Sequence, residues 1–331
     1  MSATTNDLDP YLNDPAGWGA SMAHHAELLR GCLDAVGARS ILEVGAYAGD
    51  LTRVLADWAA PTGAHVLAVD PSPQAELVEL AERHPGVELV RQTSLAALPS
   101  VELPDVALID GDHNYYTVSE ELRIIGDRAP ESALPLLLFH DVCWPHGRRD
   151  DYFDATAIPA ELRQPLIGAG MGIFPGDPGA RRDGLPYPRS AAHEGGPRNG
   201  VLTAVEDFAV SREDLTLVVV PAFFGFGAVW SDRAPWAAAV EALLRPWDRH
   251  PLLARLEANR VRQIARGHAG QVALWDLQER QSRIQRLLER LLQSSAFTVA
   301  ERLSQLRARA GIATEQTVIS RAEIRRALSE R

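Results

Sequence analysis

The sequence predicts a doubly wound α/β fold with a largely parallel sheet, followed by a helical extension. Short apolar runs of strand length alternate with helical segments as far as Val142. A turn of small residues joins the first run to the helix after it, as in nucleotide-binding folds. From Ala234 onward, Leu, Arg, Glu and Gln dominate, and strand signals vanish. Strands that alternate with helices imply βαβ units, so we expect helices on both faces of the sheet.

Five apolar runs precede the first long irregular stretch, and two more follow it. We predict strands at 40–45, 65–70, 87–92, 105–111, 134–142, 215–221 and 225–230. Between them, apolar residues at helical spacing predict helices at 21–36, 51–60, 73–83, 118–125 and 201–210. The last two strand segments lie only a few residues apart, which favours an antiparallel pair.

Changes in composition divide the chain into segments. Residues 1–20 are predicted to be a loose lead-in, and 21–235 the main α/β domain. Within that domain, 145–200 is rich in Gly, Pro, Arg and Asp and lacks periodicity, which favours a lid or substrate-binding insertion. Residues 236–331 are predicted to form two or three amphipathic helices.

Two local signals refine the helical region. Gly267 and Gly270 mark a candidate break between helices. The sequence from Ser320 to Glu323 has capping-box spacing, which predicts the start of the last helix.

Charge and cysteine content exclude several classes of protein. The chain of 331 residues has a net charge of −11, which disfavours binding to nucleic acid. Cys32 and Cys143 form no CxxC pair, and no apolar run approaches about 18 residues, so we expect neither a disulfide framework nor a membrane span. The acidic N-terminal segment lacks the basic start and apolar run of a secretory signal, so we expect none there and predict a cytoplasmic protein.

The turn after the first predicted strand reads ILEVGAYAGD, from Ile41 to Asp50. Gly45 and Gly49 allow the backbone to approach a ligand at the start of the following helix. Glu43 is placed to hold an ammonium group, and Asp70, which closes the second strand, to accept hydrogen bonds from ribose hydroxyls. The predicted cofactor-binding residues are Glu43, Gly45, Ala46, Tyr47, Gly49, Asp70, Ser94 and Asp110.

A glycine-rich turn is also found in dehydrogenases, so an NAD-dependent oxidoreductase is one alternative. However, the dinucleotide fingerprint needs GxGxxG, whereas this chain has GxxxG between Gly45 and Gly49 after an acidic residue. This turn resembles the first motif of class I S-adenosylmethionine-dependent methyltransferases. The resemblance covers about 21–231 and implies a Rossmann-like sheet of seven strands, the last antiparallel, with S-adenosyl-L-methionine as cofactor. It also places the adenine near Thr93 and Ser94.

Two acidic and histidine-containing clusters follow neighbouring predicted strands. Asp110, Asp112 and His113 follow the fourth, and His140 and Asp141 follow the fifth. Both strand ends open on the ligand crevice of such a sheet. The alternative is that these residues cap helices and satisfy turns. We favour catalysis, with His113 as general base beside Asp110 and Asp141.

The Asp110-x-x-His113 spacing, with an acidic residue after the next strand, resembles the metal-dependent O-methyltransferases of macrolide sugars. That resemblance implies that Asp110 and Asp141 bind a divalent metal and that His113 is the base. His140 stands where the family has another carboxylate, which makes Asp110, His140 and Asp141 the candidate ligand set. The choice between Mg²⁺, another divalent cation and no metal stays open, since histidine favours softer ions than Mg²⁺.

The sequence also predicts which residues meet the methyl acceptor, a polyhydroxylated or phenolic small molecule. They are Asp112, Tyr115, Trp144, Arg148, Glu194, Arg198 and Asn199. For each residue of the insertion, a solvated surface loop is the alternative. The predicted function is O-methylation of a hydroxyl of a specialised metabolite, such as its sugar, with natural-product (antibiotic) biosynthesis as the setting. N-methylation and a non-catalytic scaffold in a biosynthetic complex are further alternatives, and the C-terminal helices favour a homo-oligomer.

Overall fold

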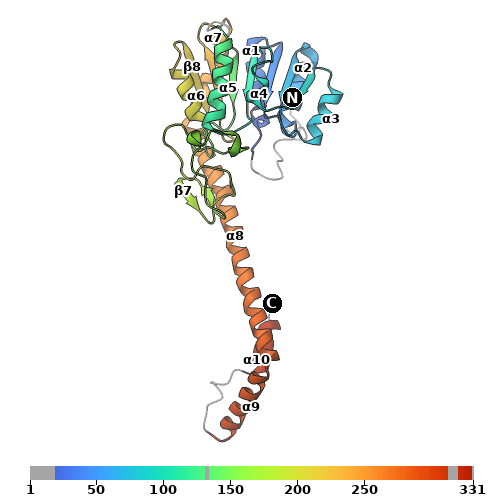
Figure 1. Cartoon of the computed structure of the whole chain (residues 1–331), viewed down its shortest axis with the longest axis vertical. Coiled ribbons are helices and arrows are strands. Elements are labelled where there is room, and N and C mark those ends of the chain that lie inside the picture. Colours follow the sequence, from blue (N-terminus) through green and yellow to red (C-terminus); the bar gives the residue numbers. More distant parts are fainter. Residues whose placement is uncertain (1–18, 131–133, 312–319, 330–331) are drawn as a thin grey trace, which may run out of the picture. The chain divides into compact units, whose positions relative to one another are not determined.

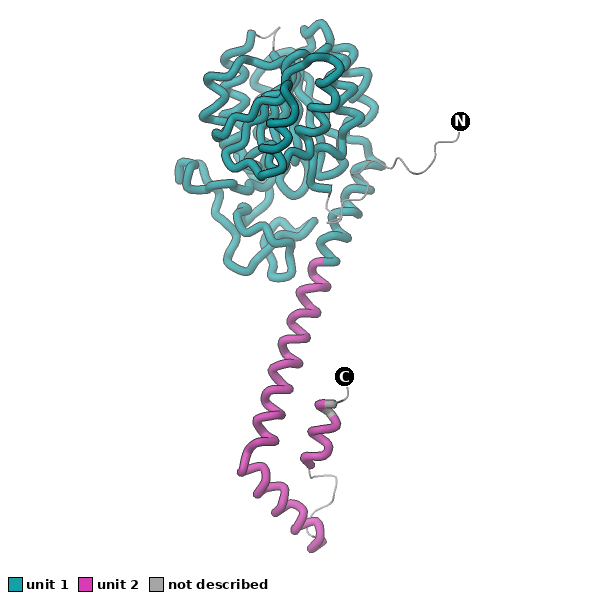
Figure 2. The backbone as a smooth tube through the Cα atoms, turned by 90° about the vertical axis from the view of Figure 1, so that its right-hand side faces the viewer, with its two compact units in different colours: residues 1–267 teal, residues 268–331 magenta. Residues whose placement is uncertain are grey.

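The structure, a computed structural model, describes residues 19–130, 134–311 and 320–329 (Figure 1). Nearly all of the predicted lead-in at 1–20 therefore lies outside the described residues. The chain divides into two compact units, residues 1–267 and residues 268–331 (Figure 2). Val240 and Leu244 of the first helical segment beyond 235 are buried in the core of the first unit. The boundary drawn near 235 from composition stays a prediction.

The first unit is built on a seven-stranded sheet in the order β3-β2-β1-β4-β5-β9-β8. Its strands are β1 (Ser40–Val44), β2 (His65–Val69), β3 (Val87–Val90), β4 (Val106–Ile109), β5 (Leu136–Phe139), β8 (Leu215–Val220) and β9 (Phe226–Ser231). The first five are mutually parallel, and β9 runs antiparallel to both β5 and β8. The predicted fold, a Rossmann-like sheet of seven strands with the last one antiparallel, is confirmed.

Helices cover both faces of the sheet, as the parallel strands require (Figure 1). One core contains residues of α1 (Ala26–Val36), α2 (Asp50–Thr62), α3 (Ala75–Arg83) and α7 (Ala237–Leu244). The core on the opposite face contains residues of α4 (Ser94–Ala97), α5 (Tyr115–Arg128) and α6 (Val201–Val210). Buried residues of β5 alternate between the faces: Leu136 and Leu138 belong to the first core, and Leu137 and Phe139 to the second.

The insertion at 145–200 contains little regular structure but is well packed. It has a two-stranded antiparallel sheet of β6 (Gly172–Phe174) and β7 (Asp177–Arg181), with short 3₁₀ turns at Ala155–Ala157 and Ala160–Leu162. Arg149 is fully buried and donates hydrogen bonds from Nη1 to Ala191 O at 2.6 Å and from Nη2 to Pro178 O at 2.8 Å. The segment that looked aperiodic in sequence therefore has its own polar core.

The remaining helices are α8 (Pro251–Gln293), α9 (Ser295–Arg309) and α10 (Arg321–Ser329). The predicted break at Gly267 and Gly270 is wrong, because both lie inside the continuous helix α8. A glycine weakens a helix interior by only about 1 kcal/mol relative to alanine, which the many other residues of a long helix offset. The capping box is confirmed: Ser320 N donates to Glu323 Oε2 at 2.8 Å, and Glu323 N donates to Ser320 Oγ at 3.2 Å. Among the described helices, none is both long and apolar enough to cross a membrane.

A buried acid in α5, Glu121, should make the stability of the fold depend on pH. Glu121 is fully buried, and burial raises its pKa from 4.5 to about 8, with partial opposition from the Ser94 hydroxyl. The folded state thus favours the neutral carboxyl. This contribution to stability is present at acidic pH and is lost as the pH rises from about 4.5 through 8.

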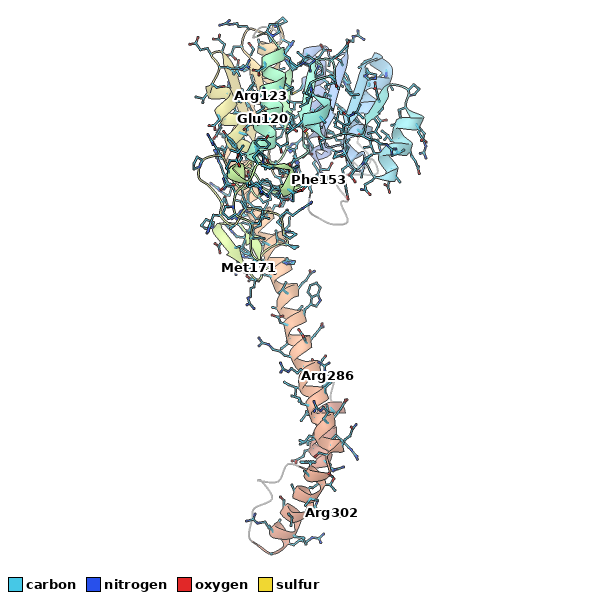
Figure 3. The ribbon with its side chains drawn as sticks, in the orientation of Figure 1. Glu120, Arg123, Phe153, Met171, Arg286 and Arg302 are labelled. Carbon is cyan, nitrogen blue, oxygen red and sulfur yellow. The ribbon has the colours of Figure 1, made fainter. Side chains whose placement is uncertain are left out.

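We therefore expect Glu121→Gln, a neutral replacement of the same shape, to raise the melting temperature relative to the wild type by an amount that grows between pH 5 and pH 9. Thermal unfolding across that range measures it. Glu120→Gln is the matched control, because Glu120 forms a surface ion pair with Arg123 at 2.8 Å (Figure 3). A melting-temperature difference between Glu121→Gln and wild type that does not change with pH would contradict the burial argument.

Candidate functional site

A cavity of about 750 Å³ lies at the carboxyl ends of the parallel strands. Its walls are the segments that follow β1, β2, β3 and β4, together with Asp141 after β5 and part of the insertion. Parallel strands that carry helices on both faces leave a crevice at this edge, where such sheets bind ligands. The predicted cofactor and catalytic segments therefore meet around one cavity.

The turn between β1 and α2 depends on Gly45. This residue has φ of 87°, and its N–H donates to Val69 O at 2.9 Å. A Cβ atom there would overlap the carbonyl oxygen of Asp110 and lie 2.5 Å from Gly111 Cα. Only glycine lets the turn lie directly against the end of β4, so the predicted cofactor loop and the predicted catalytic segment share one wall.

Gly49, the second predicted glycine, has a different position. It has φ of 86° and is the N-cap of α2, but it does not line the cavity. Its N–H donates to Ala46 O at 2.7 Å, which closes the turn. Gly49 therefore shapes the loop, whereas Ala46 and Tyr47 line the cavity directly.

Two acids lie on the cofactor side of the cavity. Asp70 accepts the N–H of Tyr47 on Oδ2 at 2.8 Å and that of Ser72 on Oδ1 at 2.7 Å. These bonds fix the carboxylate at the cavity wall and leave further lone pairs for a ligand. Glu43 is buried, and its Oε2 has no hydrogen bond within the described part of the chain. Burial raises the pKa of Glu43 to about 8, and the Oε2 atom has capacity for a donor from a ligand.

Thr93 and Ser94, predicted to lie beside an adenine, both line the cavity with Leu95. Ser94 is the first residue of α4, a short helix that the sequence reading missed. A helix of four residues has too few positions to show a periodic pattern.

The residues predicted to be catalytic form, with His140, a compact cluster of two carboxylates and two imidazoles. His113 Nε2 lies 3.1 Å from Asp141 Oδ2 and 3.4 Å from Asp110 Oδ1. His140 Nδ1 lies 3.3 Å from the same Asp110 oxygen and 3.4 Å from the same Asp141 oxygen. Asp110, His113 and Asp141 also line the cavity, whereas the His140 side chain lies completely buried behind them.

Opposite charges shift every pKa in this cluster. Burial raises the pKa of Asp110 and Asp141, but the charge of His140 outweighs burial and holds both below their usual values. Burial lowers the pKa of His113, yet Asp141 and Asp110 outweigh it and raise the pKa to about 9. The described residues by themselves therefore favour a protonated His113.

Of the residues predicted to meet the acceptor, Asp112 lines the cavity. The others do not: they are Tyr115, Trp144, Arg148, Glu194, Arg198 and Asn199. Tyr115 OH donates to Asp207 Oδ2 at 2.8 Å, and Arg148 Nη1 lies 2.7 Å from Glu206 Oε2. The sequence grouped these residues by polarity, but a polar side chain in an insertion also has to satisfy the insertion's own backbone.

Asp150, which the sequence reading left out, attaches the insertion to the catalytic segment. Its Oδ1 accepts the N–H groups of Tyr115 at 2.8 Å and Gly200 at 2.7 Å, and its Oδ2 accepts the hydroxyl of Tyr152 at 2.8 Å. Asn199 Oδ1 accepts the N–H of Asp150 at 2.7 Å. The start of the insertion is thereby fixed against the first turn of α5.

This attachment brings a short segment of the insertion to the cavity. Phe153 N donates to Asp112 Oδ1 at 2.9 Å, and Phe153, Asp154, Ala157 and Ile158 supply one wall of the cavity (Phe153 in Figure 3). Tyr116 and Thr117 line it from α5. Sequence reasoning missed these residues because their position depends on contacts across the chain, although their nearness to Asp112 was a signal for the α5 pair.

Residues 42–142 match the family model described as a methyltransferase domain. Among curated proteins, none is similar in sequence to this chain. Similar solved structures include the methyltransferase PaMTH1 of Podospora anserina bound to S-adenosylhomocysteine, with 16% identity over 68% of this chain and 89% of that one, and a TM-score of 0.42.

Two further solved structures are O-methyltransferases. TomG of Streptomyces achromogenes, involved in tomaymycin synthesis, has 15% identity over 68% of this chain and 90% of that one, with a TM-score of 0.40. The enzyme of Bacillus cereus has 15% identity over 69% and 94%, with a TM-score of 0.41. The match of residues 42–142 to a methyltransferase domain confirms the predicted enzyme class, methyltransferase, for that segment.

The contact of Gly45 with β4 gives a testable expectation. Gly45→Ala places a methyl group against Asp110 and Gly111, so we expect binding of S-adenosylhomocysteine to weaken at least about tenfold, which corresponds to about 1.4 kcal/mol. Calorimetry measures the affinity. Gly37→Ala is the matched control: Gly37 also has positive φ, at 66°, but nothing lies within 4 Å of its Cβ position. An affinity of Gly45→Ala equal to that of Gly37→Ala would contradict the argument from the close approach of Gly45 to β4.

Proposed function

Since residues 42–142 match a methyltransferase domain, we propose that this chain transfers the methyl group of S-adenosylmethionine to a hydroxyl of a small specialised metabolite, in particular of its sugar. One observation carries the proposal: His113 lies at the cavity wall, with its Nε2 held beside Asp110 and Asp141, where the cofactor loop meets the acceptor side. A positioned imidazole is suited to remove a hydroxyl proton.

Different residues of the cavity bind the different parts of S-adenosylmethionine. In this proposal Glu43, a cavity-lining acid whose Oε2 has no hydrogen bond within the described residues, holds the ammonium group of the methionine part. Asp70 accepts the ribose hydroxyls, and Thr93 and Ser94 lie against the adenine. These roles place the sulfonium between the Gly45 turn and His113.

The reaction is an in-line displacement. The acceptor oxygen forms a bond to the methyl carbon while the carbon–sulfur bond breaks, and the electron pair of that bond stays on the sulfur of S-adenosylhomocysteine. His113 takes the proton of the hydroxyl. Most of the acceleration comes from holding oxygen, carbon and sulfur in line inside the cavity.

Asp110, His140 and Asp141 are the residues that would hold a divalent metal. They fit such an ion, because the buried His140 Nδ1 has no hydrogen bond within the described chain and faces two carboxylates. When bound, the ion lowers the pKa of the substrate hydroxyl and cancels the carboxylate charge that keeps His113 protonated.

The acceptor side of the cavity suits a phenolic or polyhydroxylated molecule. Phe153, Ile158 and Tyr116 provide apolar and aromatic surface, and Asp112 and Asp154 provide hydrogen-bond acceptors for hydroxyl groups. No arginine of the described chain lines the cavity, so a phosphorylated acceptor would meet no guanidinium group there.

The base assignment has a direct test. We expect His113→Gln to lower methyl transfer roughly 10²- to 10⁴-fold while the affinity for S-adenosylhomocysteine changes little, because glutamine keeps a polar side chain but cannot take the proton. The assay follows labelled methyl groups from S-adenosylmethionine to a panel of phenols and deoxysugar glycosides. His65→Gln, on the exposed first residue of β2, is the control. Undiminished transfer by His113→Gln would remove His113 from the proposed mechanism.

We also propose that the chain forms a homo-oligomer through its C-terminal helices. In α8, Leu277, Ile284 and Leu291 recur every seven residues and are 62%, 57% and 40% exposed. Large apolar side chains at heptad spacing form the contact line of a coiled coil. A second copy of this chain offers an identical line, which allows a symmetric contact.

Ile284→Glu places a charge on that line, and we expect it to shift the chain from oligomer to monomer in light scattering coupled to size-exclusion chromatography. Arg286→Glu, a change on the same helix but outside the heptad line, should leave the mass unchanged (Figure 3). A monomeric wild-type chain would rule out the oligomer.

A further inference from the structure

We propose that the metal site formed by Asp110, His140 and Asp141 selects a first-row transition-metal dication of the Mn²⁺ to Zn²⁺ class over Mg²⁺, through a direct bond from His140 Nδ1. This inference rests on the proposed function for the use of the ion, and it specifies which class of ion the site takes.

The spacing of the three donors suits one ion. His140 Nδ1 lies 3.3 Å from Asp110 Oδ1 and 3.4 Å from Asp141 Oδ2. Ligand atoms about 2.1 Å from an ion and at right angles to each other lie about 3 Å apart. These three atoms therefore need only a small inward movement to share an ion.

The tautomer of His140 is set by its other nitrogen. His140 Nε2 lies 2.8 Å from the carbonyl oxygen of Phe223, which accepts a hydrogen bond and donates none. The proton of the neutral imidazole must then be on Nε2, and the lone pair on Nδ1 points toward the two carboxylates. A lone pair that faces two carboxylate oxygens is unfavourable unless a cation lies between them, and either a proton or a metal ion satisfies that need.

The Phe223 carbonyl is itself held in place. Phe223 and Phe224 have φ of 47° and 67°, a backbone conformation that bulky residues rarely adopt. Phe224 N donates to Glu257 Oε1 at 2.8 Å, and Cys143 N donates to Phe224 O at 2.7 Å. Arg260 binds Glu257 Oε1 at 2.6 Å and lies over the Phe224 ring at 4.5 Å. Contacts from α8 and from the segment after β5 thus fix the loop that orients His140.

The chemistry of the three ligand atoms determines which class of ion the site prefers. Mg²⁺ takes oxygen ligands in near-ideal octahedral geometry and keeps several waters. Imidazole nitrogen suits the softer dications of the first transition row. Because His140 supplies one of three protein donors and is completely buried, a water molecule cannot take its place without removing that side chain from the core.

A neighbouring group of His113, His146 and Asp151 is a weaker candidate for an ion. The rings of His113 and His146 are stacked, with centroids 4.9 Å apart and planes 12° from parallel. An imidazole lone pair lies in the plane of its ring, so one ion does not readily lie in the planes of both rings. His146 is therefore a suitable control position.

The experiment uses the full chain, freed of metal by chelation. Calorimetry compares Mn²⁺ with Mg²⁺, and pulsed electron paramagnetic resonance of the Mn²⁺ complex detects nitrogen bound to the ion. We expect one Mn²⁺ per chain, bound at least about tenfold more tightly than Mg²⁺, with nitrogen coupling from one imidazole. His140→Asp should abolish the coupling and reduce the preference for Mn²⁺, whereas His146→Asp should keep both.

The wild-type spectrum tests the inference even if His140→Asp does not fold. Equal affinity for the two ions, Mn²⁺ bound without nitrogen coupling, or no bound ion at all would overturn it, and the last outcome would make a proton the occupant of Nδ1. Loss of the coupling in His146→Asp instead would move the ion to the neighbouring group. Binding of S-adenosylhomocysteine and methyl transfer are measured separately, so failure of the proposed function is distinguishable from failure of the metal inference.

Discussion

The approach of two carboxylates at the ends of adjacent parallel strands is the constraint on which the site depends. Asp110 follows β4 and Asp141 follows β5, and the pairing of these strands brings their side chains to the same imidazoles within 3.4 Å. Two buried like charges repel each other, so the pair requires positive charge between or beside them. Protonated histidines meet that requirement, and so does the ion that we infer in place of a proton on His140 Nδ1.

The same requirement accounts for the chemistry. His113 stands on the open side of the carboxylate pair and His140 on the buried side, so the two imidazoles have different tasks. Phe223 O fixes His140 through Nε2, whereas His113 keeps access to the cavity. The proposed roles, in which His113 takes a proton and His140 binds an ion, follow from this difference in exposure.

The site also depends on close backbone packing around it. Gly45 lets the cofactor loop lie against Asp110, and Asp150 attaches the insertion to α5, which places Phe153 at the cavity. Both the Gly45 contact and the Asp150 hydrogen bonds depend on close distances, so other side chains at these two positions would disrupt them. The apolar cores, by contrast, require only that successive apolar residues of strands such as β5 point to opposite faces of the sheet.

The sequence by itself determined the fold and which strand-end residues would meet at one edge of the sheet. Strand and helix periodicity are local properties, and the carboxyl ends of parallel strands must meet, so Gly45, Asp70, Asp110, His113 and Asp141 could be predicted to converge. Only the tertiary structure decided which part of the insertion lines the cavity and how His140 is oriented. The predicted acceptor residues Arg148 and Asn199 contact other parts of the chain, whereas Phe153 lines the cavity. The physical reason is that an irregular insertion is positioned by hydrogen bonds between residues far apart in sequence, and no periodic pattern records such contacts.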